Sequence, residues 1–196
     1  MVPPDVFREQ PVLTGGRVRL EPLDGENGAA LVDGYVAMDP VVRRLTGTHQ
    51  RFTAEVLHEW FATRPDQHDR ADWAIVEREG GTVVGECALV DLDPENAAAD
   101  YRISLRNMAL TGRGYGTEAT DLVLDYAFDT AGLHRIALQV FAFNVGAQRS
   151  YARSGFVREG VWRAHLRWDG EWHDTVLMSV LAEEHARHRA ERRAGA

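Results

Sequence analysis

The chain contains no lysine, and all 22 of its basic residues are arginine. It has one cysteine, Cys87, so an internal disulfide is excluded, as expected for a protein of the reducing cytoplasm. No segment approaches the roughly 18 apolar residues of a membrane-spanning helix, and we expect no secretion signal at the start of the sequence. The formal net charge of −8 argues against nucleic acid or an anionic membrane as a partner and permits a cationic amine.

Motifs for metals and for common nucleotides are also missing. The 8 histidines show neither HxxxH nor HExxH spacing, so no metal site is expected. A Walker loop ends in Gly-Lys-Ser/Thr, which a chain without lysine cannot supply. The dinucleotide fingerprint G-x-G-x-x-G does not fit the glycine-rich segment, where the glycines instead run G-x-G-x-G.

That glycine-rich segment is the most informative part of the chain. Gly112, Gly114 and Gly116 lie where an apolar strand pattern ends and an amphipathic helix pattern begins. Glycine lets backbone N–H groups approach a ligand together, and the helix N-terminus behind them adds partial positive charge. Arg113 adds a full charge. The segment therefore predicts a phosphate-binding loop, although glycines at such a junction also form ordinary tight turns.

Two motifs resemble the GNAT superfamily of N-acetyltransferases. Residues 111–116 resemble its pyrophosphate loop, Gln/Arg-x-x-Gly-x-Gly/Ala, with Thr111 at the Gln/Arg position. Further along, the chain is similar to the signature N-x-x-A-x-x-x-Y-x-x-x-G-F. Its matching residues are Asn144, Ala147, Tyr151, Gly155 and Phe156. The resemblance is dense over residues 105–181 and is most similar to the branch that acetylates the N-termini of ribosomal proteins.

The alternation of elements predicts one α/β domain with a single mixed sheet. The resemblance implies a mostly antiparallel sheet, flanked by helices, whose central strands splay apart. We expect an N-terminal extension at residues 1–11, an acyl-CoA N-acyltransferase domain at 12–182 and a polar, Arg-rich tail at 183–196, interpreted as a frayed helix. Residues 41–52 are expected to be an acceptor loop. The predicted helices are 25–38, 53–63, 118–130 and 145–154, and the predicted strands are 17–21, 73–77, 82–90, 100–106, 136–141, 157–168 and 171–180.

The resemblance also implies acetyl-CoA as the cofactor and assigns residues to it. Backbone groups near Ser104, Leu105 and Arg106 would pair with the pantetheine amides, as a peptide adds to a sheet edge. Asn144 is expected to cap the helix that follows it, and it could also orient a water or a pantetheine amide. The pyrophosphate would be held by Thr111, Gly112, Arg113, Gly114, Tyr115, Gly116 and Thr117.

The implied reaction moves an acetyl group from a thioester to a primary amine. Tyr151, by the resemblance, gives a proton to the departing thiolate and also contacts the cofactor; an unperturbed phenol, with a pKa near 10, stays protonated at neutral pH. For the amine's base we rank Asp100 first, then no dedicated base, then Glu86. The unperturbed pKa of Asp100, near 3.9, suits a base only if burial raises it.

The acceptor is the least constrained part of the prediction. A protein or peptide N-terminus is favoured because the motifs are most similar to the ribosomal-protein branch. The alternatives are a small-molecule amine, such as a polyamine or an aminoglycoside, and a non-catalytic module that senses acyl-CoA. Whether the domain forms a homodimer stays open at this point.

Overall fold

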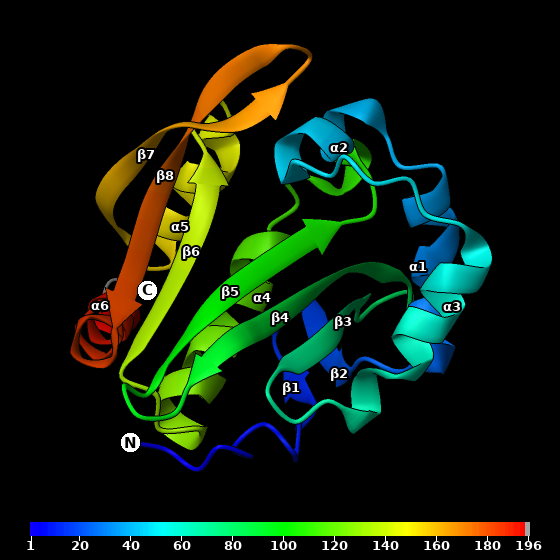
Figure 1. The fold of residues 1–196 in the computed structure, drawn as a ribbon. Helices are drawn as coiled ribbons and strands as arrows, with labels where there is room; N and C mark the ends of the chain where they lie inside the picture. The colour runs from blue at the N-terminus through cyan, green and yellow to red at the C-terminus, as the bar shows by residue number, and fades with distance from the viewer. Residues whose placement is uncertain (195–196) are drawn as a thin grey trace.

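One eight-stranded mixed sheet organises residues 1–194, the part of the chain that the computed structural model describes (Figure 1). The strand order is β1-β2-β3-β4-β5-β6-β8-β7, and only β5 and β6 run parallel. The predicted fold class, mostly antiparallel with flanking helices, is confirmed. The strands are β1 Leu13–Thr14, β2 Val18–Pro22, β3 Ala71–Glu77, β4 Val83–Asp93, β5 Ala98–Leu105, β6 Arg135–Phe141, β7 Val157–Trp168 and β8 Glu171–Leu181.

Helices cover both faces of the sheet. On one face α1 and α3 pack over β3 around Phe61, and on the other α4 packs around Trp73 and Leu124. None of the helices within residues 1–194 is long and apolar enough to cross a membrane. The helices are α1 Gly25–Val36, α2 Pro40–Thr46, α3 Ala54–Ala62, α4 Tyr115–Asp125, α5 Val145–Arg153 and α6 Ala182–Ala194, with short helical turns at η1 Arg64–Asp66, η2 Met108–Leu110 and η3 Tyr126–Thr130.

The prediction of a loop at residues 41–52 is wrong over the first part of this segment, which is helix α2. Asp39 caps this helix by accepting a hydrogen bond from the Val41 N–H at 2.7 Å, and Pro40 occupies its first turn. Gly47, with φ of 64°, ends it in the left-handed conformation that favours glycine. The start and stop signals were therefore present in the sequence, but the helix is too short for its periodicity to show.

Helix α4 begins earlier than predicted, at Tyr115 rather than Glu118. Gly112 and Gly114 adopt φ values of 75° and 87°, whereas Gly116 is helical. Two glycines thus form the loop and the third belongs to the first helical turn. The helix ends in the π-helical turn η3, which occupies the remainder of the predicted segment.

Both ends of the described chain pack against the domain. Phe7 is fully buried in the main core, so residues 1–11 contribute to its packing. In α6, His185 is 5% exposed and its Nε2 lies 2.8 Å from Asp125 Oδ1. Arg189 reaches the same carboxylate at 2.9 Å. The interpretation of the tail as a frayed helix is therefore wrong over this part, because its charges pair with the acidic face of α4 and η3.

The central strands splay apart as the resemblance implied. Strands β5 and β6 pair only from Ala98 with Arg135 to Asp100 with Ala137. Beyond that point β6 stays paired with β8 and β5 stays paired with β4, so the two strands diverge (Figure 1). The sheet therefore contains a gap that widens toward the loop before α4.

Candidate functional site

The gap leaves some β5 backbone groups without a partner strand. Arg106 donates its N–H to the Val84 C=O at 3.0 Å, and the Ala97 C=O accepts from the His134 N–H at 2.7 Å on the opposite side. Backbone groups alternate in direction along a strand, so we infer that Ile103 and Leu105 face the gap. Of the three residues named from sequence, Leu105 fits this position. The Arg106 N–H is bonded to β4 within the sheet. The backbone groups of Ser104, two residues earlier on the strand, point in the same direction, away from the gap.

The glycine-rich loop presents an uncapped helix N-terminus. Gly114 is the N-cap of α4, and no side chain of residues 1–194 caps this end. The first-turn N–H groups, which have no partner inside a helix, are therefore available to an anion. The Tyr115 O–H donates to Glu77 at the end of β3, which anchors the helix start to the sheet. Thr111 turns away from this end and donates its hydroxyl to the Met108 C=O at 2.7 Å.

A groove of about 490 Å³ opens beside the loop and is lined by four arginines and three acidic residues, Glu118, Asp121 and Asp125. Arg113 was named from the sequence. The other three, Arg17, Arg153 and Arg192, come from the β1–β2 turn, α5 and α6. Three of the seven predicted loop residues, Thr111, Tyr115 and Gly116, are not among the residues lining this groove.

Glu118 explains how Arg17 reaches the loop. Its carboxylate accepts hydrogen bonds from the backbone N–H groups of Gly16, Arg17 and Val18 at 2.7, 2.8 and 3.1 Å. The turn between β1 and β2 is thereby fixed to the first turn of α4, and the Arg17 side chain lies beside Gly114. No short-range pattern predicts a contact between positions about one hundred residues apart.

The second motif lies on α5, on the same side of the sheet as α4. Asn144 caps α5 by accepting the Ala147 N–H at 3.2 Å, as predicted. The Tyr151 ring packs edge-on against Tyr101 and Phe156, with centroid separations of 6.5 and 5.8 Å. Because Tyr101 directly follows the last β5–β6 pair, Tyr151 lies near the closed end of the gap. Burial raises the pKa of Tyr151 to about 12.

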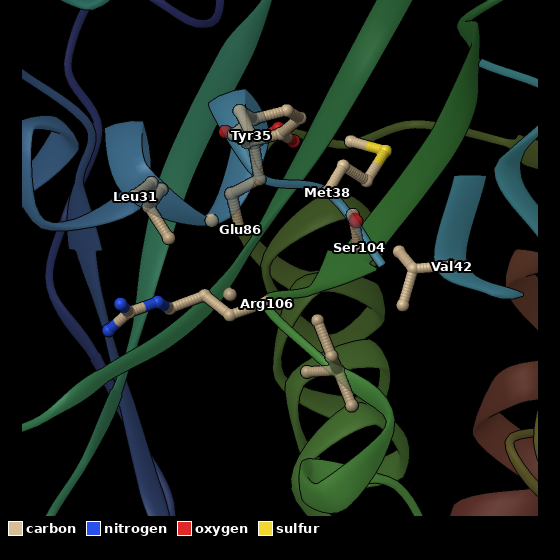
Figure 2. Close-up of a pocket in the computed structure, with 10 residues that line it drawn as sticks. Leu31, Tyr35, Met38, Val42, Glu86, Ser104 and Arg106 are labelled. Carbon is tan, nitrogen blue, oxygen red and sulfur yellow. The ribbon is translucent and has the colours of Figure 1, made fainter. Parts of the chain in front are cut away.

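Glu86 lies on the opposite face, in a small cavity between α1 and the sheet. Tyr35 and Ser104 line the cavity with it, and the remaining walls are largely apolar (Figure 2). The Tyr35 O–H donates to Glu86 Oε1. Oε2 is buried and has no hydrogen-bond partner within residues 1–194. The space is about 10 Å³, room for about one water molecule.

Burial gives Glu86 the character of a base near neutral pH. Burial is the main cause that raises its pKa, to about 7, and the hydrogen bond from Tyr35 opposes the rise. Burial also raises the pKa of Asp100, with the neighbouring Asp91 adding to the effect. A carboxylate with a pKa near 7 can take a proton from an amine without a large energy cost.

Asp100 lies away from this cavity. Glu86 pairs with Ser104 across the strands, and Asp100 lies on β5 at an even spacing from Ser104. The side chains of Asp100 and Glu86 are therefore on the same face of the sheet. Asp100 precedes Ser104 by four residues, which is about 13 Å along a strand. It also lies at the last β5–β6 pair, where the gap is still closed. The structure therefore brings Glu86 close to the open part of the gap and leaves Asp100 at its closed end.

The side chains of Tyr101 and Ser104 on β5 face opposite sides of the sheet. Tyr101, which contacts Tyr151, bonds to Thr120 of α4 at 3.1 Å and so faces that helix. Ser104 has the opposite parity and faces α1 with Glu86. Tyr151 and Glu86 therefore lie on opposite faces of the sheet, with Tyr151 beside Tyr101 toward the closed end of the gap and Glu86 opposite Ser104, three residues further along β5.

Comparisons with known proteins agree with this fold. Residues 17–157 match the family described as "Acetyltransferase (GNAT) domain". The chain is 40% identical over 73 residues to the probable N-acetyltransferase YjcK of Bacillus subtilis (strain 168), a match that covers 37% of this chain and 40% of that protein.

Two solved structures show the same fold. Ribosomal-protein-S5-alanine acetyltransferase from Vibrio fischeri has a TM-score of 0.79 at 17% identity, covering 89% of this chain and 98% of that chain. Spermidine N-acetyltransferase from Vibrio cholerae, in complex with CoA and spermine, has a TM-score of 0.77 at 19% identity, covering 88% of this chain and 99% of that chain. At these identities the likeness concerns the fold alone.

Proposed function

Because the chain belongs to the GNAT acetyltransferase family, we propose that it acetylates the N-terminal α-amine of a peptide or protein with acetyl-CoA. GNAT acetyltransferases use acetyl-CoA as co-substrate, and three features of this chain fit it. The N-terminus of α4 and three of the groove arginines, Arg17, Arg113 and Arg153, suit the phosphates, whereas Arg192 pairs with Asp121 at 2.5 Å. The unpaired β5 edge at Ile103 and Leu105 suits the pantetheine amides. The gap offers a route for the acyl chain into the sheet.

The observation that carries the reaction is the buried, unpartnered Oε2 of Glu86. When bound, acetyl-CoA supplies a thioester carbonyl that the amine attacks, and the C–S bond breaks. Glu86 Oε2 accepts the proton that the amine loses. Tyr151, on the opposite side, donates a hydrogen bond to the leaving sulfur. Full proton transfer from a phenol of pKa about 12 to a thiolate of pKa about 8.5 is uphill by about 5 kcal/mol, so the hydrogen bond is the main contribution we assign to Tyr151.

The basicity of Glu86 favours an α-amine over a polyamine. A peptide α-amine has a pKa of about 8, so transfer of its proton to a carboxylate of pKa about 7 costs about 1.4 kcal/mol. A lysine-like primary amine, with a pKa of about 10.4, requires about 4.6 kcal/mol. Glu86 is also the only acidic residue lining its cavity, so no second carboxylate of that lining could pair with a further ammonium group of a polyamine.

A polyamine is the second candidate acceptor, because the structurally similar Vibrio cholerae protein is a spermidine N-acetyltransferase solved with spermine. We expect this chain to acetylate short peptides with a free N-terminus and to turn over spermidine weakly or not at all. An assay of free-thiol release with both acceptors tests this expectation. Robust turnover of spermidine with inert peptides would replace the proposed acceptor, and inertness toward every amine would favour the acyl-CoA sensor.

A second expectation concerns Tyr151. The substitution Tyr151→Phe keeps the ring against Tyr101 and removes the hydrogen-bond donor, so turnover should fall about 100-fold while acetyl-CoA affinity persists. Single-turnover kinetics and calorimetry measure the two quantities separately. Equal chemical rates for the variant and the wild-type enzyme would remove Tyr151 from the mechanism.

A further inference from the structure

Tyr35 on α1 makes the one side-chain hydrogen bond that reaches the Glu86 carboxylate in residues 1–194. The two residues are 51 positions apart, and Tyr35 lies outside both sequence motifs. Its phenol occupies Oε1, which leaves Oε2 buried and unpartnered. Figure 2 shows Tyr35 beside Glu86, with Met38 and Val42 forming another side of the cavity. Helix α1 therefore touches the proposed base directly.

The position of the Tyr35 ring is itself constrained. The ring packs edge-on against Phe52, with centroids 6.0 Å apart, and lies 6.3 Å from the Phe61 ring. Phe61 in turn lies against Gly28 of α1, where an added Cβ would lie 2.5 Å from the aromatic ring. This close packing of α1 on α3 limits where the phenol can point, so the hydrogen bond to Glu86 holds one carboxylate orientation.

We propose that Tyr35 is a positioning residue for acetyl transfer: by occupying Oε1 it leaves Oε2 as the oxygen that takes the proton of the acceptor amine. The inference rests on the proposed function, because it requires Glu86 to be the base. A hydrogen bond to a carboxylate also stabilises its ionised form. Tyr35 thus has two effects on Glu86, one on its orientation and one on the pH at which it ionises.

Other charged groups also act on Glu86, and the test must separate them from Tyr35. Within the described chain none of them hydrogen-bonds to its carboxylate. Arg70 pairs with Asp72 at 2.6 Å, and Arg106 donates to the Val83 C=O at 3.3 Å. Asp72 on β3, Arg70 just before it and Arg64 in η1 act on the pKa of Glu86. Arg106, the residue after β5, lines the same cavity. They stay in place when only the Tyr35 hydroxyl is removed.

The test is the pH dependence of peptide acetylation by Tyr35→Phe. Loss of the hydroxyl should move the rising limb of the kcat/KM profile upward by about one pH unit, because the ionised carboxylate loses a donor. At pH 7 this lowers activity about fivefold, while acetyl-CoA affinity stays unchanged. Tyr126→Phe is the matched control, since Tyr126 is a buried tyrosine that packs on Trp73 in the other core. It should keep the wild-type profile.

A double-mutant cycle shows whether Tyr35 acts through Glu86. In a Glu86→Gln background, Tyr35→Phe should change kcat by less than twofold, because the group on which it acts is gone. A wild-type pH profile for Tyr35→Phe, or an equal loss of activity in both backgrounds, overturns the inference while the proposed base stands. Full activity of Glu86→Gln alone overturns the proposed base itself, which distinguishes the two failures.

Discussion

Glu86→Gln should lower kcat/KM for peptide acetylation by about 10² to 10⁴-fold, the usual contribution of a positioned general base. Glutamine fills nearly the same space and can still accept the Tyr35 hydrogen bond, so the cavity should keep its shape. It has no carboxylate to take the amine proton. The wild-type rate should rise with pH through about 7, and in the variant this limb should be replaced by one near about 8, where the peptide amine itself loses its proton. Stopped-flow or thiol-release assays across pH 5.5 to 9 measure both changes.

The same substitution should make the protein more stable at alkaline pH. The pKa of Glu86 is raised from 4.5 to about 7 in the folded state, so its stabilising contribution is present below pH 4.5 and is lost as the pH rises through 7. The variant does not ionise. Its stability relative to wild type should therefore grow by about 3 kcal/mol between pH 4 and pH 9, measured by denaturant unfolding.

Glu159→Gln serves as a control, because the stabilising contribution of Glu159 should change with pH in the opposite direction to that of Glu86. Glu159 bonds to Arg135, which is the main cause that lowers its pKa to about 2. Its stabilising contribution is thus present above pH 4.5 and is lost as the pH falls through about 2, so the variant should be less stable at neutral pH and keep its pH–rate profile.

A Glu86→Gln enzyme with wild-type turnover and an unchanged rising limb would exclude Glu86 as the base.

The parts of the site that could be predicted are those that depend on residues close to one another in the sequence. The loop at Gly112 and Gly114 and the cap at Asn144 depend on local backbone requirements, and both lie where the motifs indicated. The choice between Asp100 and Glu86 depends on where β5 and β6 stop pairing. That register comes from packing against β8 and the helices, and no local pattern of the sequence encodes it.

Long-range contacts account for the residues that the sequence interpretation missed. Arg17 reaches the groove because Glu118 binds the turn that carries it. Tyr35 reaches Glu86 because α1 packs across β4. A tyrosine in an amphipathic helix and an arginine beside a strand are ordinary residues in sequence. Their roles follow only once the tertiary structure places a carboxylate or a glycine-rich loop next to them.

The second large effect is expected at Gly116, where the substitution Gly116→Asp should abolish acetyl-CoA binding without unfolding the domain. Gly116 has helical geometry, and a Cβ added there would meet only Ile103, at 3.8 Å. Aspartate in the first turn is also favourable for the helix dipole. Although Gly116 does not line the arginine groove, the carboxylate would project from the same first turn of α4 whose N–H groups we assign to pyrophosphate. Two unit charges 4 Å apart repel by about 4 kcal/mol near a protein surface, so affinity should fall at least about 100-fold.

Gly146→Asp provides a matched control because Gly146 occupies the same position of α5 as Gly116 does of α4, and a Cβ there meets nothing within 4 Å. It should retain wild-type affinity in calorimetry. The folded state of Gly116→Asp is checked by its thermal midpoint, which acetyl-CoA should no longer raise. A ligand that binds only the native state raises the thermal midpoint. A normal acetyl-CoA-induced shift in a folded Gly116→Asp variant would therefore show that the phosphates do not bind at the N-terminus of α4.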